Sequence, residues 1–358
     1  MRTKKQIIFF HIVSWIIAYG FLGVMIFLLD EARAGFLDKK LEMDLFFVIR
    51  VLITAGIFVG IALGGIDILL RRISNKKHSF RFYIIIRSLL YTFAFVLILS
   101  VIITHASAFY VERVLQISIG EEGVRLVHNF IFTLTVYSIF VSILISFISE
   151  VNKKFGPGVL IRLLMGKYYN PKVEDRIFVF LDLKSSTTYA EKLGHIKYSE
   201  LIQDCFNDLN IVVAEYKAEI YQYVGDEAVL TWTVNRGLEN TNYLRFYFAF
   251  QDRIIKRSDF YKEKYGFVPE FKAGVNGGNI TVTEIGDIKR EIAYHGDVIN
   301  TAARIQEVCN TYDKKLLISE FLAEKLDAAS NYTSEKVGSI LLKGKELPVS
   351  IFSVEMHS

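Results

Sequence analysis

The sequence predicts four transmembrane helices followed by a soluble α+β domain. The chain of 358 residues is 52% hydrophobic and has a mean hydropathy of +0.33, which is too apolar for a protein that folds wholly in water. The apolar excess lies in residues 1–150, whereas short apolar runs alternate with amphipathic segments from residue 176 onwards. We therefore assign 1–150 to a membrane domain, 151–175 to a connector and 176–358 to a soluble domain.

Four apolar stretches of the membrane domain are long enough to cross a bilayer, which takes about 20 residues of helix. They lie at 7–29, 45–70, 83–104 and 130–149. Three more stretches follow the first one. We therefore expect an integral membrane protein with a retained anchor, in contact with lipid, rather than a cleaved signal peptide.

Basic residues mark one side of this membrane domain. They gather before the first stretch, between the second and third, and after the fourth, at Arg2, Lys4, Lys5, Arg71, Arg72, Lys76, Lys77, Arg81, Lys153 and Lys154. The other two loops mix acidic and basic residues. By the positive-inside rule, both termini and the soluble domain lie in the cytoplasm. The formal net charge of +4 is then explained by membrane topology, and we expect no nucleic-acid partner.

Four polar residues fall within or near the apolar stretches, namely His11, Arg50, Asp67 and Arg87. Charges inside a membrane often mark a ligand or ion pathway. Long side chains near helix ends can instead extend to the interface. We expect the charged residues to lie at the interface and His11 to pack between helices.

The connector and the soluble domain show a regular succession of elements. Gly156-Pro157-Gly158 and a short amphipathic helix at 159–164 punctuate the connector. After it we predict a strand at 176–183, a helix at 187–216, a hairpin at 219–233, a helix at 240–265, a strand pair at 270–285, a helix at 297–310 and strands near 316 and 340. This order predicts an α+β sheet with helices on one face.

Two aspartates stand at the ends of predicted strands. Asp182 follows the apolar run of the first strand, and Asp226 lies in the turn of the hairpin. Singly, Asp182 could cap a helix and Asp226 could belong to an ordinary Gly-Asp turn. Together, on strands that we expect to be neighbours, they favour a divalent-metal site, because a buried carboxylate is costly unless it is paired or metal-bound.

Three further groups could bind a nucleotide. The backbone around Ser185 and Ser186 opens a helix and could bind phosphate, although serine is common at any helix start. Asn300 and Arg304 are four residues apart on one helix face, where they could hold a ribose and neutralise a phosphoryl group. An ordinary surface helix explains this pair equally well. Lys343, beside a glycine, suits either a phosphate contact or a solvated hairpin.

Five motifs in this order resemble the class III nucleotidyl cyclases, the adenylate and guanylate cyclases. The motifs are Phe180-Leu-Asp-Leu183, Gly225-Asp226, Lys272-Ala-Gly-Val-Asn-Gly-Gly278, Gly296-Asp-Val-Ile-Asn-Thr-Ala-Ala-Arg304 and Lys343-Gly-Lys345. The resemblance covers about residues 176–354 and implies a ferredoxin-like catalytic domain. With the apolar stretches ahead of it, the chain resembles a membrane-anchored bacterial cyclase of the inner (plasma) membrane.

The resemblance implies two Mg²⁺ or Mn²⁺ ions per active site, held by Asp182, Asp226 and the carbonyl group of Leu183. The ribose 3′-oxygen of a nucleoside triphosphate would attack the α-phosphorus in line and release pyrophosphate. In this family the metal aspartates of one chain meet the Asn/Arg pair of another. The resemblance therefore implies an active homodimer.

By the same resemblance, Asn300 orients the ribose, Arg304 stabilises the pentavalent phosphorus and Lys343 contacts the terminal phosphates. The base-binding positions depart from the family pattern. Gln222 stands where adenylate cyclases often have lysine, and Ala293 stands where they commonly have aspartate or threonine.

Neither base-binding residue matches the glutamate and cysteine of guanylate cyclases. Conversion of ATP to 3′,5′-cyclic AMP is therefore expected only from the frequency of ATP in the family, and GTP or a pyrimidine triphosphate remains an alternative. A catalytically silent membrane receptor with a cyclase-like dimerisation module is the alternative to an enzyme. The presence of both aspartates, Asn300 and Arg304 favours the enzyme.

Overall fold

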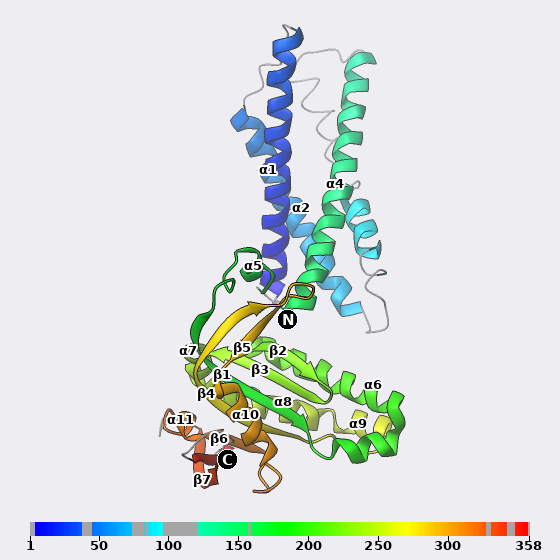
Figure 1. Ribbon diagram of the computed structural model, residues 1–358. Coiled ribbons are helices and arrows are strands. Elements are labelled where there is room, and N and C mark those ends of the chain that lie inside the picture. The colour runs from blue at the N-terminus through cyan, green and yellow to red at the C-terminus, as the bar shows by residue number, and fades with distance from the viewer. Residues whose placement is uncertain are drawn as a thin grey trace. The chain divides into compact units, whose positions relative to one another are not determined.

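The computed structural model describes residues 4–37, 45–73, 82, 85–95, 121–156, 159–326, 331–341 and 348–356. The chain divides between residues 155 and 156 into an N-terminal helical unit and a C-terminal unit built on a mixed sheet (Figure 1).

The N-terminal unit contains α1 (Lys4–Leu37), α2 (Leu45–Ile73), α4 (Glu121–Phe155) and a shorter apolar helix at Ile85–Phe95. In the described residues, three segments are long and apolar enough to cross a membrane: Lys4–Leu28, Leu52–Leu70 and Phe132–Asn152. Of the predicted span 83–104, only 85–95 lies in a described helix. Three of the four predicted spans are therefore supported, and the count of four stays a prediction.

A polar cluster lies buried among the helices of this unit. Arg87 pairs with Asp67 and donates a hydrogen bond of 3.3 Å to Glu150 Oε1. His11 Nε2 lies 3.6 Å from Asp67 Oδ2 and 3.2 Å from the hydroxyl group of Tyr91. Asp67 and Arg87 are only 2% and 5% exposed. The prediction that these two charges extend to the interface is therefore wrong, since they are buried against each other.

Within the described residues, the C-terminal unit has an eight-stranded sheet. Its strands are β1 (Lys172–Leu183), β2 (Glu219–Val224), β3 (Glu227–Thr233), β4 (Phe271–Ile285), β5 (Glu291–His295), β6 (Leu316–Ser319), β7 (Tyr332–Ile340) and β8 (Val349–Met356). The order is β2-β3-β1-β4-β6-β8-β7, and β5 pairs with β4. The β4–β6 pair is parallel, whereas the other pairs are antiparallel.

Strand β1 lies inside this sheet, between β3 and β4, and is buried on both faces. Ile177, Val179 and Leu181 pack against α6 (Ser186–Glu215), α8 (Asn242–Lys256) and α9 (Ser258–Tyr265). Because side chains alternate along a strand, Phe178 and Phe180 face the other side. There they pack near Ala302 of α10 (Asp297–Glu307). The prediction of helices on one face is therefore incomplete.

Helix α10 approaches β4 with no side chain between the two backbones at Gly274. A Cβ atom at this position would lie 2.1 Å from the backbone nitrogen of Gln306 and 2.6 Å from the carbonyl oxygen of Ala302. Only glycine permits this approach. The contact fixes how close α10 lies to the end of β1, where Asp182 stands.

The segment before β1 packs on the same unit. The guanidinium group of Arg162, in α5 (Val159–Leu164), donates two 3.3 Å hydrogen bonds to Glu219 at the start of β2. Glu219 also accepts a 3.1 Å hydrogen bond from the buried Arg176 of β1. The segment that links the two units is thus tied to β1 and β2 by ion pairs. Three short helices complete the unit: α7 (Val234–Leu238), a 3₁₀ turn (Glu239–Thr241) and α11 (Glu320–Ala323).

Candidate active site

Pairing between β1 and β3 brings the two predicted metal ligands together. Asp182, next to the last residue of β1, is opposite Glu227, the first residue of β3. Asp226 precedes Glu227 in the tight β2–β3 turn, which Gly225 permits with a φ of 61°. The carboxylates of Asp182 and Asp226, which are 44 positions apart in the chain, thus interact electrostatically at the end of β1.

Two donors converge on one oxygen of Asp182. Gln306 Nε2 donates a hydrogen bond of 2.8 Å to Asp182 Oδ2, and Lys272 Nζ lies 3.4 Å from the same atom. Burial and the charge of Asp226 nevertheless raise the pKa of Asp182, and the two donors offset only part of this effect. The carboxylate is therefore less stabilised than its two contacts suggest.

The other carboxylates of the site lack comparable support. Oδ2 of Asp226 is buried and has no hydrogen-bond partner in the described part of the chain. Burial, together with the charges of Asp182 and Asp226, raises the pKa of Glu227 to about 7. A buried carboxylate oxygen without a donor and a surplus of negative charge are the conditions that a divalent cation relieves.

The residues present therefore fit a hard divalent metal ion. Among the described residues, no three His, Cys, Asp or Glu side chains are spaced to enclose an ion. Two carboxylates and a backbone carbonyl such as that of Leu183, at the end of β1, leave the remaining positions to water and substrate oxygens. Such an open arrangement is typical of sites where Mg²⁺ also contacts phosphates.

The predicted phosphate contacts lie directly after β1. Ser185 is exposed and adopts a left-handed conformation with a φ of 60°, and α6 begins at Ser186. No side chain caps the first turn of α6 in this structure, so its backbone N–H groups are not satisfied by the preceding serine. Lys343, the other predicted phosphate ligand, lies outside the described residues.

Asn300 and Arg304 lie on the exposed face of α10, away from the aspartates of their own chain. Thr301, Ala302, Ile305 and Gln306 form the buried face of this helix. Arg304 Nη1 donates a 2.6 Å hydrogen bond to Glu307 Oε2. Across the described segments, no hydrogen bond or ion pair joins Asn300 or Arg304 to Asp182 or Asp226.

The two base-binding positions lie on strands that do not pair with each other, β2 and β5. Gln222 in β2 is exposed, whereas Ala293 in β5 is only 6% exposed. Their neighbours Tyr221 and Tyr294 make an edge-to-face contact with ring centroids 4.9 Å apart. Gln222 can donate and accept hydrogen bonds, whereas the methyl group of Ala293 can do neither.

Three site residues escaped the sequence analysis: Lys272, Gln306 and Glu227. Glu227 directly follows Asp226, so the pair of adjacent acidic residues in the hairpin turn could have identified it. Lys272 stands in one of the motifs, but its contact with Asp182 depends on the β1–β4 register. Gln306 follows Arg304 by two residues, and only the packing of α10 reveals its partner.

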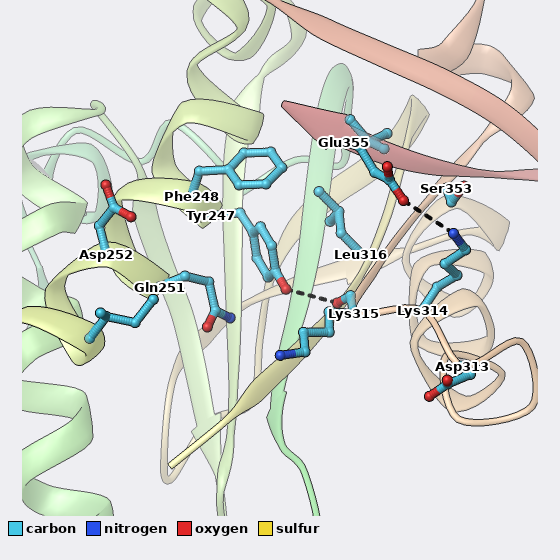
Figure 2. Close-up of a pocket in the computed structure, with 12 residues that line it drawn as sticks. Tyr247, Phe248, Gln251, Asp252, Asp313, Lys314, Lys315, Leu316, Ser353 and Glu355 are labelled. Atoms are coloured by element: carbon cyan, nitrogen blue, oxygen red, sulfur yellow. Dashed lines mark hydrogen bonds and ion pairs between the residues drawn. The ribbon is translucent and has the colours of Figure 1, made fainter. Parts of the chain in front are cut away.

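One cavity of the C-terminal unit lies away from these residues. It has a volume of about 450 Å³ and lies beside α8, the start of β6 and the end of β8 (Figure 2). Two of its polar contacts are internal: Tyr247 donates a 3.0 Å hydrogen bond to the carbonyl group of Lys315, and Lys314 pairs with Glu355 at 3.2 Å. We do not assign the nucleotide to this cavity, because none of the residues discussed above lines it.

Comparison with known proteins agrees with the geometry. The family model of the adenylate and guanylate cyclase catalytic domain matches residues 169–355, more than half of the chain. The fold is also similar to that of a bacterial light-regulated adenylyl cyclase, with a TM-score of 0.50 at 17% identity, over 61% of this chain and 64% of that one. The chain belongs to the class III adenylate and guanylate cyclase family.

Two curated relatives are named adenylate cyclases. Adenylate cyclase 2 of Rhizobium meliloti (strain 1021) is 33% identical over 223 residues, which are 62% of this chain and 61% of that protein. An adenylate cyclase of Anabaena cylindrica is 22% identical over 184 residues, 49% of this chain and 36% of that protein. The chain thus matches less than two thirds of the length of these relatives.

Proposed function

We propose that the protein is a membrane-anchored adenylate cyclase, which converts ATP to 3′,5′-cyclic AMP and pyrophosphate. The observation that carries the proposal is the pair Asp182 and Asp226, which share a charge-rich site at the end of β1 and interact through their charges. Its relatives named adenylate cyclase support ATP as the substrate. The three apolar helices support anchoring in a membrane. The proposed location of both termini in the cytoplasm rests instead on the basic residues of the loops, and it requires the fourth predicted span, at 83–104.

Different residues of this chain would bind the metal ions and the phosphate groups. Asp182, Asp226 and the carbonyl group of Leu183 would hold the two divalent ions. Such ions polarise phosphoryl oxygens and lower the pKa of a bound hydroxyl group. The uncapped first turn of α6, near Ser185 and Ser186, would bind phosphate oxygens through its N–H groups. Lys343 would add a positive charge beside the terminal phosphates.

A homodimer would complete this site. Asn300 and Arg304 are exposed on α10, and their helix turns its opposite face towards Asp182. The pair is therefore available to a second chain, where Asn300 would orient the ribose. Arg304 would neutralise the charge that develops on the α-phosphoryl group. To do so it would exchange its contact with Glu307 for the phosphate oxygens.

The base-binding positions support a second candidate substrate. Gln222 is exposed and can pair with the edge of a purine or a pyrimidine, and Ala293 gives no further hydrogen bond to select adenine. GTP or a pyrimidine triphosphate therefore remains the alternative to ATP.

The test is to incubate the full chain in detergent with Mn²⁺ and each of ATP, GTP, CTP and UTP, and to identify products by mass spectrometry. We expect cyclic AMP from ATP, and no product from a chain with Asp182→Asn. A cyclic product from another nucleotide alone would reassign the substrate. No product from any nucleotide, in a protein that is folded and dimeric, would favour the silent receptor.

A further inference from the structure

Gln306 is a buried amide aimed at the reaction centre. Gln306 is only 5% exposed and lies on the buried face of α10. Its Nε2 atom donates to Asp182 Oδ2 at 2.8 Å, across 124 positions of the chain. A hydrogen bond from an amide to a carboxylate is stronger than one between neutral groups.

The other contact to this oxygen is longer and comes from a charged group. Lys272 lies opposite Asp182 in the β1–β4 register, and its amine is 3.4 Å from Oδ2. Lysine reaches its partner through a flexible chain of four carbons, so it provides charge without a fixed direction. Gln306, held by a helix, provides the direction.

The backbone contact at Gly274 sets the reach of this amide. The backbone nitrogen of Gln306 itself is the atom nearest to the point where a Cβ of residue 274 would stand. The helix backbone is therefore pressed against β4 at the residue whose side chain holds Asp182. This arrangement leaves the amide little freedom to move away from the carboxylate.

We propose that Gln306 is a positioning residue, which fixes the orientation of the metal-binding carboxylate of Asp182. This inference rests on the proposed function. It gives α10 two roles on opposite faces: the buried face orients the carboxylate of its own chain, and the exposed face presents Asn300 and Arg304. Groups that hydrogen-bond to metal ligands typically contribute about 10- to 100-fold to metal affinity or activity.

The test is Mn²⁺ binding to the full chain in detergent without nucleotide, followed by electron paramagnetic resonance. Gln306→Leu removes the donor while nearly keeping the volume, and Gln306→Asn keeps an amide that is one methylene too short. Gln251→Leu is the matched control, because Gln251 also donates through Nε2, but to the backbone carbonyl of Phe271 at 2.9 Å. Asp182→Asn identifies the ions that this site holds.

We expect the dissociation constant for Mn²⁺ to rise about 10-fold in Gln306→Leu and to stay unchanged in Gln251→Leu. The Mn²⁺ concentration for half-maximal cyclase activity should rise in parallel, with the KM for nucleotide unchanged at saturating Mn²⁺. If Gln306→Leu does not fold, Gln306→Asn should show a rise of the same sign.

Two outcomes separate this inference from the proposed function. Wild-type Mn²⁺ affinity in a folded Gln306 variant, with weakened binding in Asp182→Asn, would overturn the inference alone. Equal Mn²⁺ binding in the wild type and Asp182→Asn would overturn the metal site, and the role of Gln306 with it.

Discussion

At the scale of single residues, Glu227 shows how neighbouring carboxylates raise one another's pKa. It lies between Asp226, its neighbour in the chain, and Asp182, its partner across the β1–β3 ladder. Burial first, and then these two charges, raise its pKa to about 7. At neutral pH the metal-free site therefore holds a carboxyl group that is partly protonated only because the protein is folded.

This shift gives a pH-dependent stability. A carboxyl group with a folded pKa near 7 and an ordinary unfolded pKa binds more protons in the folded state between pH 4.5 and 7. The free energy of unfolding therefore falls as the pH rises through this window. We expect Glu227→Gln to raise the melting temperature of the metal-free protein at pH 8, and to have little effect at pH 4.5.

The measurement is thermal unfolding in the presence of a chelator at both pH values. Glu335→Gln, on an exposed part of β7, is the control and should change neither value. Equal melting temperatures for the wild type and Glu227→Gln at pH 8 would contradict the electrostatic account. Saturating Mn²⁺ should reduce the difference, because a bound cation offsets the same charge.

Among the site residues, those that depend on local pattern could be predicted and those that depend on packing could not. Asp182 and Asp226 stand where an apolar run and a Gly-Asp turn end, so the sequence itself marks them. Gln306 is one polar residue of an amphipathic helix. Its role depends on Gly274, since no periodicity shows which strand α10 packs on.

At the scale of elements, the close approach of α10 to β4 links stability to the site. We expect Gly274→Ala to destabilise the C-terminal unit by about 1–3 kcal/mol, because the added methyl group must displace the helix backbone. The same displacement should move Gln306 away from Asp182 and weaken Mn²⁺ binding.

The check is denaturant unfolding together with Mn²⁺ titration. Gly65→Ala is the control, because a Cβ atom at that position of α2 meets nothing within 4 Å. A Gly274→Ala protein with wild-type stability and wild-type Mn²⁺ affinity would contradict the tight packing of α10.

Most elements followed from hydrophobic periodicity, but their placement in the sheet did not. The predicted strand pair at 270–285 is wrong, because these residues form the single strand β4, and the predicted helix at 240–265 is divided into α8 and α9. The strand at 176–183 was expected and is found as the longer β1, because its apolar run continues from an amphipathic start at Lys172. The face covered by α10 was missed. Its buried residues are mostly small or polar, Thr301, Ala302 and Gln306, and such a face does not indicate a core-facing helix.

At the scale of the whole molecule, the exposed pair on α10 predicts complementation between chains. Asp182→Ala and Arg304→Ala should each be inactive. In a mixture of equal amounts, random exchange gives half of the dimers as heterodimers, each with one intact site out of two. We therefore expect recovery of about one quarter of the wild-type activity.

Cyclase activity of the mixed and re-equilibrated proteins measures this recovery. A mixture of Asp182→Ala with Asp226→Ala is the control and should stay inactive, since both changes damage the same half of the site. Absence of recovery in mixtures that contain heterodimers would contradict a site shared between chains.

The buried cluster of Asp67, Arg87 and Glu150 limits how the helices of the N-terminal unit can move relative to one another. It joins residues from α2, the helix at 85–95 and α4, and His11 extends it to α1. Shifting one helix relative to the others would separate these ion pairs. It would leave a charge unpaired in a medium of low dielectric constant, at a cost of several kcal/mol. We therefore expect the helices of this unit to tilt or rotate together, as one bundle.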